Sequence, residues 1–544
     1  MSDLWTAYLN HDPGLAPFFT HPPGDWASVV EARRRMGARP LDHEAIDEIA
    51  RANAQWGVAP CVVERAFLLG RNETVVIATG QQAGLLGGPL YTSYKAIAAV
   101  RWAERLERDL GISIVPIFWV ASDDDDLDEV RSFRWQNAEG KWGEYGYQPA
   151  QHRPGMPVYD VPIEPKLRDD LAQVFAQLHQ TEFTADLAQR INAIAAEAND
   201  LEAFFIRILA WLLGERAPLF ISPRMSWVRR SSAVIIEREL GEAGESSRRI
   251  IEAGNRLRAL GFHPGLHRRP QHVNCFVLDG GLRHKILATG ERFEVIAPTG
   301  GRRATDAAQL RSELASNPAR FSPNVVTRPI VQDLALPTLA YVAGPGEVSY
   351  FAQMRGVYEM FGIPMPIILP RPQVCLIEPR VERALAKLGV AVERVAASSP
   401  EQFDTLVRNA TRPSATKGQL DVAQQRMNEA LEFVGSQADL SDPAVARSYE
   451  RLRNAVRIGL EKLASRQRER SLSHDTRMER AFTTARESLW PAGLPQERGL
   501  TIFLPFLNLF GTQLILRLAE AIRLDAKDVQ PIVLSLLMAG KGKS

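Results

Sequence analysis

The sequence predicts an α/β protein built on a mainly parallel, doubly wound sheet with an inserted α-helical arm. Up to residue 379, short apolar runs of strand type alternate with segments of helical spacing, which is typical of parallel sheets. Gly-rich loops follow two of these runs, as they do where a strand turns into a helix. Beyond residue 379 the apolar residues recur at intervals typical of long helices.

The predicted strands are rich in β-branched and aromatic side chains, which favour strands over helices. They are 74–79, 112–120, 218–222, 273–278, 338–342 and 366–369. After the first of them, Pro89 can begin a helix because its missing N–H is not needed there. The apolar residues of that helix recur at helical spacing, at Leu90, Tyr94, Ile97 and Val100.

The arm is predicted to be a helical hairpin or coiled coil, with an ordinary helical bundle as the alternative. One heptad-spaced series is Val381, Leu385, Leu388, Val392 and Val395. A second apolar face consists of Leu420, Ala423, Met427, Ala430 and Val434. The predicted parts are an N-terminal extension packed on the core (1–70), the core (71–379), the arm (380–488) and a C-terminal segment that returns to the core (489–544).

Composition excludes several classes of protein. Of the 544 residues, 45% are hydrophobic and 24% are charged, the ordinary globular range. The chain has 65 basic and 64 acidic residues, which gives a net charge of +1. It therefore has no overall positive field that would attract the phosphate backbone of a nucleic acid. Three cysteines cannot form a disulfide framework and suit a reducing cytoplasm. The uncharged run 499–516 contains Pro505 and Gln513, so we expect a buried segment and no membrane association.

The first candidate site is the Gly-rich loop between the first predicted strand and its helix. In an open α/β sheet, ligands bind beyond the carboxyl ends of the strands, and glycines allow close backbone approach. The spacing matches neither a dinucleotide loop nor a phosphate loop. A tight connecting turn is the alternative, and a lysine on the following helix could simply be solvated. The candidate binding residues here are Gly80, Gln81, Gln82, Gly84, Thr92 and Lys95.

The second candidate is the acidic run 123–129, directly after the strand 112–120. Adjacent carboxylates repel one another, so such a cluster persists where it binds a cation, an amine or basic side chains. Asp124 or Asp126 could act as a general base toward an amine, or could bind Mg²⁺ with substrate phosphates. The alternative is a helix N-terminus, whose dipole favours acidic residues.

The third candidate surrounds the strand 338–342, which is followed by a second Gly loop. Arg328 offers a bidentate fork for a carboxylate or phosphate, with a structural ion pair to Asp333 as the alternative. The further candidates of this region are Gln332, Gly344, Gly346, Glu347, Tyr350 and Gln353. Three histidines (263, 267 and 272) lie near Asn274 without a metal-binding motif, so no metal site is predicted there.

Six segments occur in an order that resembles one known family. They are TGQQAGLLGGPLYTSYKA, PIFWVASDDDDLDEV, SPNVVTRPIVQD, YVAGPGEVSYFAQM, GIPMPIILPR and LWPAGLPQER. Together they resemble the cysteine-adding enzymes of bacillithiol biosynthesis, the BshC family. The resemblance implies a Rossmann-like core, a coiled-coil arm and a homodimer formed through that arm. The chain departs from the family at Asp125, where a histidine is usual, and at Thr327, where leucine is usual.

The resemblance also implies a reaction, in which the carboxyl group of cysteine is joined to the free amine of glucosaminyl-malate. Lys95, Arg328 or Arg371 would then neutralise substrate carboxylates, and Gln81, Gln82, Asn274 and Gln353 would suit hydroxyls. Because amide formation from a free carboxylate needs activation, ATP and Mg²⁺ are the expected cofactors. Two alternatives stay open: another nucleotide-dependent transferase on the same core, or a non-enzymatic coiled-coil scaffold.

Overall fold

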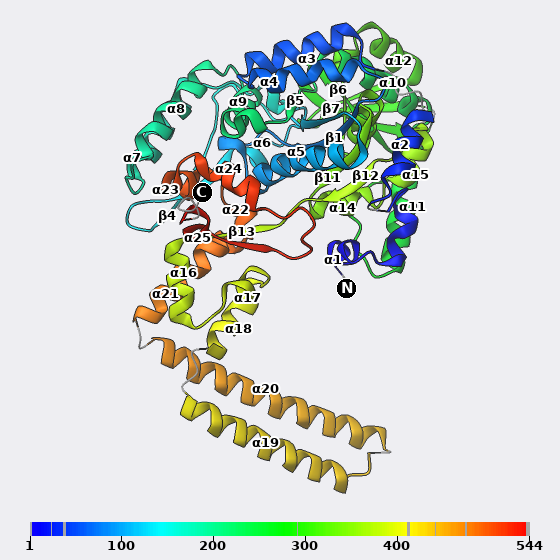
Figure 1. The fold of residues 1–544 in the computed structure, drawn as a ribbon. Helices are drawn as coiled ribbons and strands as arrows, with labels where there is room; N and C mark the ends of the chain where they lie inside the picture. The colour runs from blue at the N-terminus through cyan, green and yellow to red at the C-terminus, as the bar shows by residue number, and fades with distance from the viewer. Residues whose placement is uncertain are drawn as a thin grey trace. The chain divides into compact units, whose positions relative to one another are not determined.

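The chain divides into two compact units (Figure 1). The computed structural model describes residues 3–22, 24–35, 40–290, 292–410, 414–440, 442–473 and 476–539. The first unit consists of residues 1–374 and 497–528, and the second of 375–496 and 529–544. The boundaries drawn from the sequence at 70, 379 and 488 stay predictions.

The first unit contains the predicted parallel sheet. Its strands are β1 (Val75–Gln81), β2 (Ile114–Val120), β5 (Leu219–Ile221), β11 (Thr338–Ala343) and β12 (Ile367–Pro370). They lie in the order β12-β11-β1-β2-β5, and every neighbouring pair is parallel. From β1 the chain first adds β2 and β5 on one side, and later β11 and β12 on the other. The doubly wound α/β prediction is confirmed, and β1 and β11 flank the point where the winding direction reverses.

The helix after β1 is also as predicted. α5 (Leu90–Leu110) begins after Pro89, which is its N-cap, and ends at Gly111 in the left-handed conformation. Its stripe of Leu90, Tyr94, Ile97 and Val100 is buried. α5 packs against both β1 and β2, which brings its first turn beside the carboxyl end of β1.

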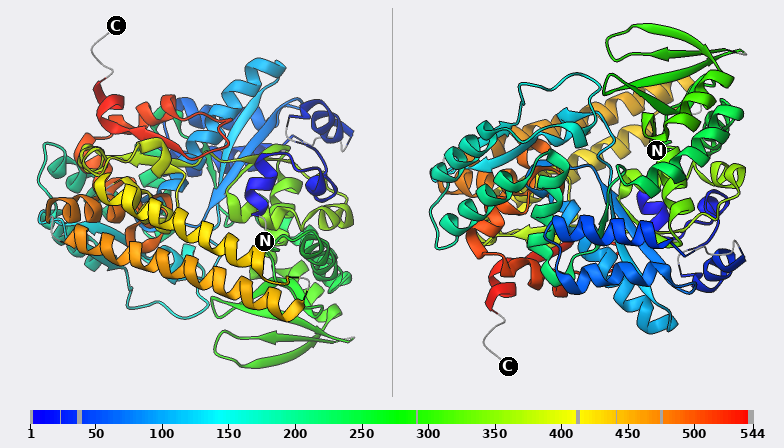
Figure 2. Two further views of the ribbon diagram at one scale, coloured as in Figure 1. Left: turned by 90° about the horizontal axis from the view of Figure 1, so that it is seen from below. Right: turned by 90° about the horizontal axis from the view of Figure 1, so that it is seen from above.

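One predicted strand belongs to a different sheet. β6 (His272–Asp279) lies in an antiparallel sheet with β7 (Leu282–Thr289), β8 (Arg292–Ile296), β9 (Arg302–Asp306) and β10 (Phe321–Pro323) (Figure 2). Its assignment to the parallel sheet was therefore wrong. The reason is the tight connection through Gly280 and Gly281, both at positive φ, which leaves no room for a crossover helix. The apolar face of this sheet, including Val273, Cys275 and Ile286, packs around its own core.

The remaining elements of the first unit surround the two sheets. Before β1 lie α1 (Leu4–Leu9), α2 (Trp26–Arg35), α3 (His43–Gln55) and α4 (Pro60–Val63). Between β2 and β6 lie α6 (Leu127–Val130), β3 (Ser132–Gln136), β4 (Trp142–Gly146), α7 (Pro165–Gln177), α8 (Thr184–Glu197), α9 (Leu201–Leu213), α10 (Ser226–Gly241) and α11 (Glu245–Ala259). After β9 lie α12 (Ala307–Ser316), α13 (Thr327–Ala335), α14 (Pro345–Phe351) and α15 (Arg355–Phe361), and near the C-terminus α22 (Gln496–Gly499), α23 (Asn508–Phe510) and α24 (Gln513–Ala521).

The uncharged run near the C-terminus is buried in the first unit, as expected. Phe503, Leu504 and Phe506 each have 1% or less of their surface exposed. Within the ranges that the structure describes, none of the helices combines the length and the apolar character needed to cross a membrane.

The second unit is helical, with a two-stranded sheet formed by β13 (Val374–Ile377) and β14 (Gln530–Val533). Its helices are α16 (Pro379–Leu388), α17 (Val392–Ala396), α18 (Pro400–Ala410), α19 (Ser414–Gln437), α20 (Pro443–Ser473), α21 (Thr476–Leu489) and α25 (Leu534–Ala539). α19 and α20 lie side by side as a helical hairpin (Figure 1). The Tyr449 hydroxyl of α20 donates to the Leu431 carbonyl of α19 at 3.0 Å.

The first heptad series of the arm does not form a coiled coil, so that part of the prediction was wrong. Gly389, at φ 66°, ends α16, and a separate short helix follows. Val381, Leu385, Leu388 and Val395 are instead buried in a compact core that includes α21 residues. The second predicted face lies on α19, where Met427 and Val434 are exposed, while the side chain of Leu420 lies outside the described part of the chain.

The backbone of the edge strand β5 is hydrogen-bonded by a side chain of α3. The Asn53 amide of α3 donates to the Phe220 carbonyl at 2.9 Å, and its Oδ1 accepts from the Phe220 N–H at 2.8 Å. Asn53 is fully buried, so both backbone groups of Phe220 depend on it.

We expect Asn53→Ala to lower the free energy of unfolding by about 2–4 kcal/mol, since it leaves two buried backbone groups unpaired. Urea denaturation followed by circular dichroism measures the change. Gln55→Ala, an exposed position on the same helix, is the control and should change stability by less than about 0.5 kcal/mol. Equal stabilities for the two variants would show that Asn53 does not hold the strand.

Candidate active site

A cavity of about 400 Å³ lies where the winding direction of the parallel sheet reverses. It is lined by residues that follow β1, β2 and β11, together with residues of α5 and α14. Several predicted site residues meet in it: Gly80, Gln81, Gln82, Lys95, Asp124, Arg328, Gly344, Gly346, Glu347, Tyr350 and Arg371. We call it the first cavity. Its position is the one where open α/β sheets bind their ligands.

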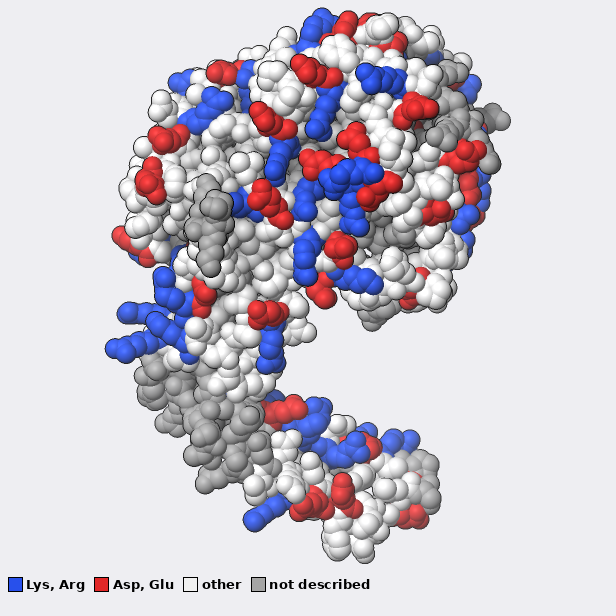
Figure 3. All heavy atoms as spheres, viewed as in Figure 1, with Lys and Arg blue, Asp and Glu red and all other residues white. Residues whose placement is uncertain are grey.

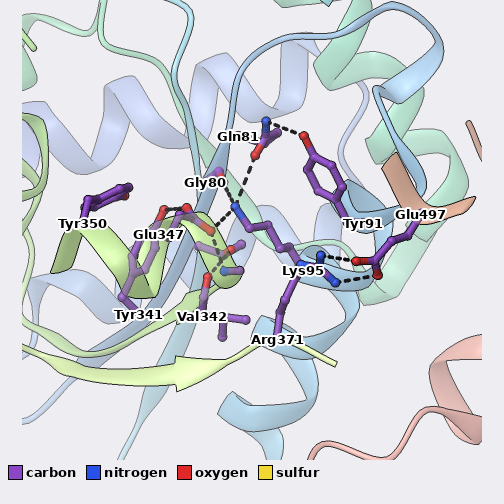
Figure 4. A network of polar contacts seen from close by, with 12 residues as sticks. Gly80, Gln81, Tyr91, Lys95, Tyr341, Val342, Glu347, Tyr350, Arg371 and Glu497 are labelled. Carbon is purple, nitrogen blue, oxygen red and sulfur yellow. Dashed lines mark hydrogen bonds and ion pairs between the residues drawn. The ribbon is translucent and has the colours of Figure 1, made fainter. Parts of the chain in front are cut away.

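A buried lysine lines the first cavity, and Figure 4 shows its polar contacts. Lys95 is 2% exposed, and its Nζ lies 2.5 Å from Glu347 Oε2. The same ammonium group donates to the Gly80 carbonyl at 2.7 Å and to Gln81 Oε1 at 3.2 Å. Burial lowers the pKa of Lys95, and the charge of Glu347 opposes that shift. Lys95 is therefore a partnered structural cation, not a solvated one.

Glu347 joins the two halves of the sheet. Its Oε1 accepts from the Tyr341 hydroxyl at 2.9 Å, and its Oε2 accepts from the Gly344 N–H at 2.7 Å. Through Lys95 it therefore connects α14 to α5. Two glycines allow this close packing: a Cβ at Gly80 would lie 2.7 Å from the Trp119 carbonyl oxygen, and one at Gly344 would lie 3.0 Å from Arg371 Nε.

The acidic run after β2 separates into different environments. Gln82 Nε2 donates to Asp124 Oδ2 at 2.7 Å and to Glu129 Oε2 at 2.9 Å, so two carboxylates face one amide at the cavity. Asp126 instead caps α6 and accepts from the Glu129 N–H. Asp126 lines neither the first cavity nor a second cavity that adjoins it. The catalytic prediction for Asp126 stays a prediction.

Two arginines of the first cavity have different partners. Arg371 is buried and forms a bidentate pair with Glu497, at 2.8 and 2.5 Å. Arg328 is 9% exposed and donates to Gln332 Oε1 at 3.2 Å and to the Tyr350 hydroxyl at 3.4 Å. It forms no ion pair with any carboxylate in the described ranges. The alternative of an Arg328–Asp333 pair is thus not found, and Arg328 is a buried cation available to an anion.

Asp123 belongs to the predicted acidic run, but the sequence reasoning singled out Asp124 and Asp126 and not this residue. It is 4% exposed, and its carboxylate accepts no hydrogen bond from any residue that the structure describes. Burial raises the pKa of Asp123, with Arg283 and Arg229 acting against that shift. Its position as the first acid of the run, immediately after β2 and Ser122, was the available signal.

A second cavity, of about 410 Å³, adjoins the first. It lies against the antiparallel sheet and shares Ala121, Asp124, Val325 and Arg328 with the first cavity. Arg283 stands in its wall and binds Asp124 at 3.0 Å and Asp125 at 2.7 Å. The charge of Asp125 is thus paired with an arginine.

Five predicted binding residues lie outside the first cavity. Asn274 and Gln353 are buried, and their amides bond to protein groups, including Ser246, Ser247 and the backbone of Leu266. Gln332 bonds to Arg328 and Asp333. Thr92 is fully buried on α5, and Gly84 packs against Gly88 in the loop.

The acidic residues of the site do not form a metal cluster by themselves. In the part of the chain that the structure describes, no three or more His, Cys, Asp or Glu side chains are grouped to hold a metal ion. Over the face seen in Figure 3, Lys and Arg are interspersed with Asp and Glu, in keeping with the near-zero net charge.

Comparison with known proteins identifies similar chains. Residues 1–372 match the family description "Bacillithiol biosynthesis BshC, N-terminal Rossmann-like domain", and residues 374–529 match "Bacillithiol biosynthesis BshC, C-terminal coiled-coil domain". A protein of Prosthecochloris aestuarii named "Putative cysteine ligase BshC" is 33% identical, over 90% of this chain and 88% of its own. Proteins of the same name from Salinibacter ruber (29%; 97% and 96%) and Symbiobacterium thermophilum (30%; 95% and 95%) are similar over nearly their full lengths.

The buried carboxyl group of Asp123 predicts a pH-dependent stability. Because its pKa is raised in the folded protein, the fold favours the protonated form, and that stability is lost as pH rises through the folded pKa. Asp123→Asn removes this loss, so the variant should be more stable than the wild type at pH 8, and the difference should shrink toward pH 4.

Urea denaturation at both pH values measures the difference. Asp47→Asn, at an exposed position on α3, is the control and should follow the wild type at both values. An Asp123→Asn protein that is less stable than the wild type at pH 8 would contradict the argument, because it would mean that the charged form is favoured by the fold.

Proposed function

The chain belongs to the BshC family of bacillithiol biosynthesis, and we propose that it is the cysteine ligase that joins the carboxyl group of cysteine to the free amine of glucosaminyl-malate. The observation that carries the proposal is the first cavity, where cationic and anionic side chains face one another at the reversal point of the sheet. Such a lining suits substrates that carry carboxylates, an amine and hydroxyls together.

The residues of the first cavity have distinct parts in this proposal. Arg328, which has no carboxylate partner among the described residues, binds a substrate carboxylate. Asp124, at the wall shared by both cavities, orients the amine and takes its proton when nitrogen bonds to the activated carboxyl carbon. The bond from that carbon to the oxygen of its phosphate or nucleotide leaving group then breaks, and the leaving group departs with the electron pair. Gln81 and Gln82 offer amide groups to the hydroxyls of the sugar.

Amide formation from a free carboxylate needs activation, and we propose ATP with Mg²⁺ for this purpose. The donor set fits such a pair: Glu129, which faces Gln82 at the cavity, would supply a carboxylate to Mg²⁺ beside phosphate oxygens, and Asp124 is left to take the amine proton. ATP would supply the free energy of activation. The three free cysteines of the chain are compatible with a reaction in the reducing cytoplasm.

The proposal is tested by incubating the purified protein with cysteine and glucosaminyl-malate, with and without ATP and Mg²⁺, and following the products by mass spectrometry. We expect the cysteinyl amide only when ATP and Mg²⁺ are present. Product without ATP would contradict the activation step. No product in any mixture, from a protein shown to be folded, would contradict the ligase proposal.

Asp124→Asn should lower kcat by about 10²-fold or more, because it removes the group that takes the amine proton. The control is Asp128→Asn in the same acidic run, whose carboxylate is 82% exposed and pairs with Arg131 at 2.6 Å. It should leave kcat within about twofold, since surface ion pairs contribute little. Equal kcat values for wild type and Asp124→Asn would remove this assignment.

We further propose that the protein is a homodimer formed through the hairpin of α19 and α20. Large apolar side chains on both helices are exposed, among them Val422, Met427, Val434, Leu452 and Ile458. Monomers rarely expose contiguous apolar surface of this kind, and a second hairpin could cover it by coiled-coil packing.

Leu452→Glu should shift the protein from dimer to monomer, because it places a charge in the proposed apolar interface. Light scattering after size-exclusion chromatography measures the mass. Asn454→Glu lies two residues further along α20, on another face of the helix, and should leave the dimer intact. A monomeric wild-type protein at micromolar concentration would contradict the proposed dimer.

A further inference from the structure

The second cavity carries more positive charge than its acidic residues balance. Its lining includes four cationic side chains: Arg268, Arg283, Lys285 and Arg328. Among the residues that the structure describes, only Arg283 forms ion pairs there, with Asp124 and Asp125. Arg268, Lys285 and Arg328 form none with the carboxylates of the described ranges. Asp123 also lines this cavity, but it does not balance these three positive charges, because burial favours its protonated form.

Two of the unpaired cations are withdrawn from water. Arg328 is 9% exposed and reaches both cavities. Arg268 is partly buried, and its guanidinium donates to Asn274 Oδ1 at 3.0 Å and to the His267 carbonyl at 3.2 Å. Burial lowers the pKa of Arg268. For Arg268 this burial is costly, and an anionic ligand would relieve that cost. Burial acts in the same direction on Arg328, but Tyr341, Tyr350 and Glu347 outweigh it and raise the pKa of Arg328.

The other wall of the second cavity is apolar. Phe276 of β6, Leu287 of β7 and Val325 line it with apolar side chains that are at least partly exposed, whereas Val273, Cys275 and Ile286 are buried in the core of the antiparallel sheet. A bare inorganic anion would leave this wall uncovered, whereas an organic body attached to the anionic group would bury it. The wall shared with the first cavity, at Asp124 and Arg328, would place such a ligand next to whatever the first cavity holds.

We propose that the second cavity binds the polyanionic end of an organic substrate, with its charges held by Arg268, Lys285 and Arg328. The inference rests on the proposed function, which offers two sources of that chemistry: the dicarboxylate of the malyl group and the phosphates of the activating nucleotide. Both present two or more negative charges on an organic body. The first cavity then holds the other reactant, and the reacting groups meet at the shared wall.

Isothermal titration calorimetry of the full chain, with sodium tripolyphosphate and with L-malate as separate probes, tests this inference. At least one probe should bind, and the tighter one identifies the source. Arg268→Gln and Lys285→Gln should each weaken it by about tenfold or more, because each removes a charge-assisted contact. Lys285 is exposed on β7 and has no buried partner to disturb, so its variant should fold normally.

Arg269→Gln is the matched control, because Arg269 is the exposed neighbour of Arg268 and does not line the cavity. It should bind the probe within about twofold of the wild type, as expected for a surface charge. Equal weakening by Arg269→Gln and Arg268→Gln would show that probe binding depends only on the overall charge of the protein, and would overturn the inference. Unchanged binding in both cavity variants, or no binding of either probe to the wild type, would overturn it as well.

The two proposals fail in different ways. A protein that forms the amide but binds neither probe keeps its proposed function and loses the second-cavity site. A protein that binds a probe through Arg268 and Lys285 but forms no amide under any condition keeps the site and loses the proposed reaction.

Discussion

The ion pair between Lys95 and Glu347 is the interaction on which the architecture of the site depends. A buried ammonium group has three protons to satisfy, and Lys95 has three acceptors: Glu347, the Gly80 carbonyl and Gln81. These partners come from α14, from β1 and from the end of β1. One side chain therefore ties together the two halves of the sheet at the point where the winding reverses. Removal of either charge would leave the other buried without its partner.

Paired and unpaired charges divide the site into a frame and a binding surface. Lys95 with Glu347, and Arg371 with Glu497, are matched pairs within the first unit, and their charges are already neutralised. Arg328 is different, because its hydrogen bonds are to an amide and a hydroxyl, and among the described residues it forms no ion pair. The matched pairs hold the backbone in place, so that the unmatched cation keeps a fixed direction toward the cavities. Preorganised charge of this kind is worth more than charge on a mobile side chain.

Features that depend on local sequence were predictable, and features that depend on long-range contact were not. The strand runs, the Gly loops and the stripe of α5 follow from neighbouring residues, and they were found from the sequence. The partner of Lys95 lies far along the chain, so no spacing rule could name Glu347 as its counter-ion. Within the acidic run, composition could not separate Asp123 from Asp126, because the direction of each carboxylate is set by how the chain leaves β2. Similarly, the heptad prediction that began at Val381 did not take Gly389 into account. Gly389 ends α16, and the same apolar residues pack into a compact core instead of a coiled coil.

The adjoining cavities suit a reaction that joins two molecules. Bond formation between two bound reactants gains from holding them in contact with the correct orientation, and a shared wall supplies that contact. Here the shared wall carries Asp124 and Arg328, a carboxylate and a guanidinium, which are the groups to which we assign proton transfer and anion binding. Asp124 is itself held by Gln82 from the loop after β1 and by Arg283 from the antiparallel sheet. The second sheet is therefore part of the site, because without Arg283 the carboxylate between the two cavities would lose one of the two side chains that position it.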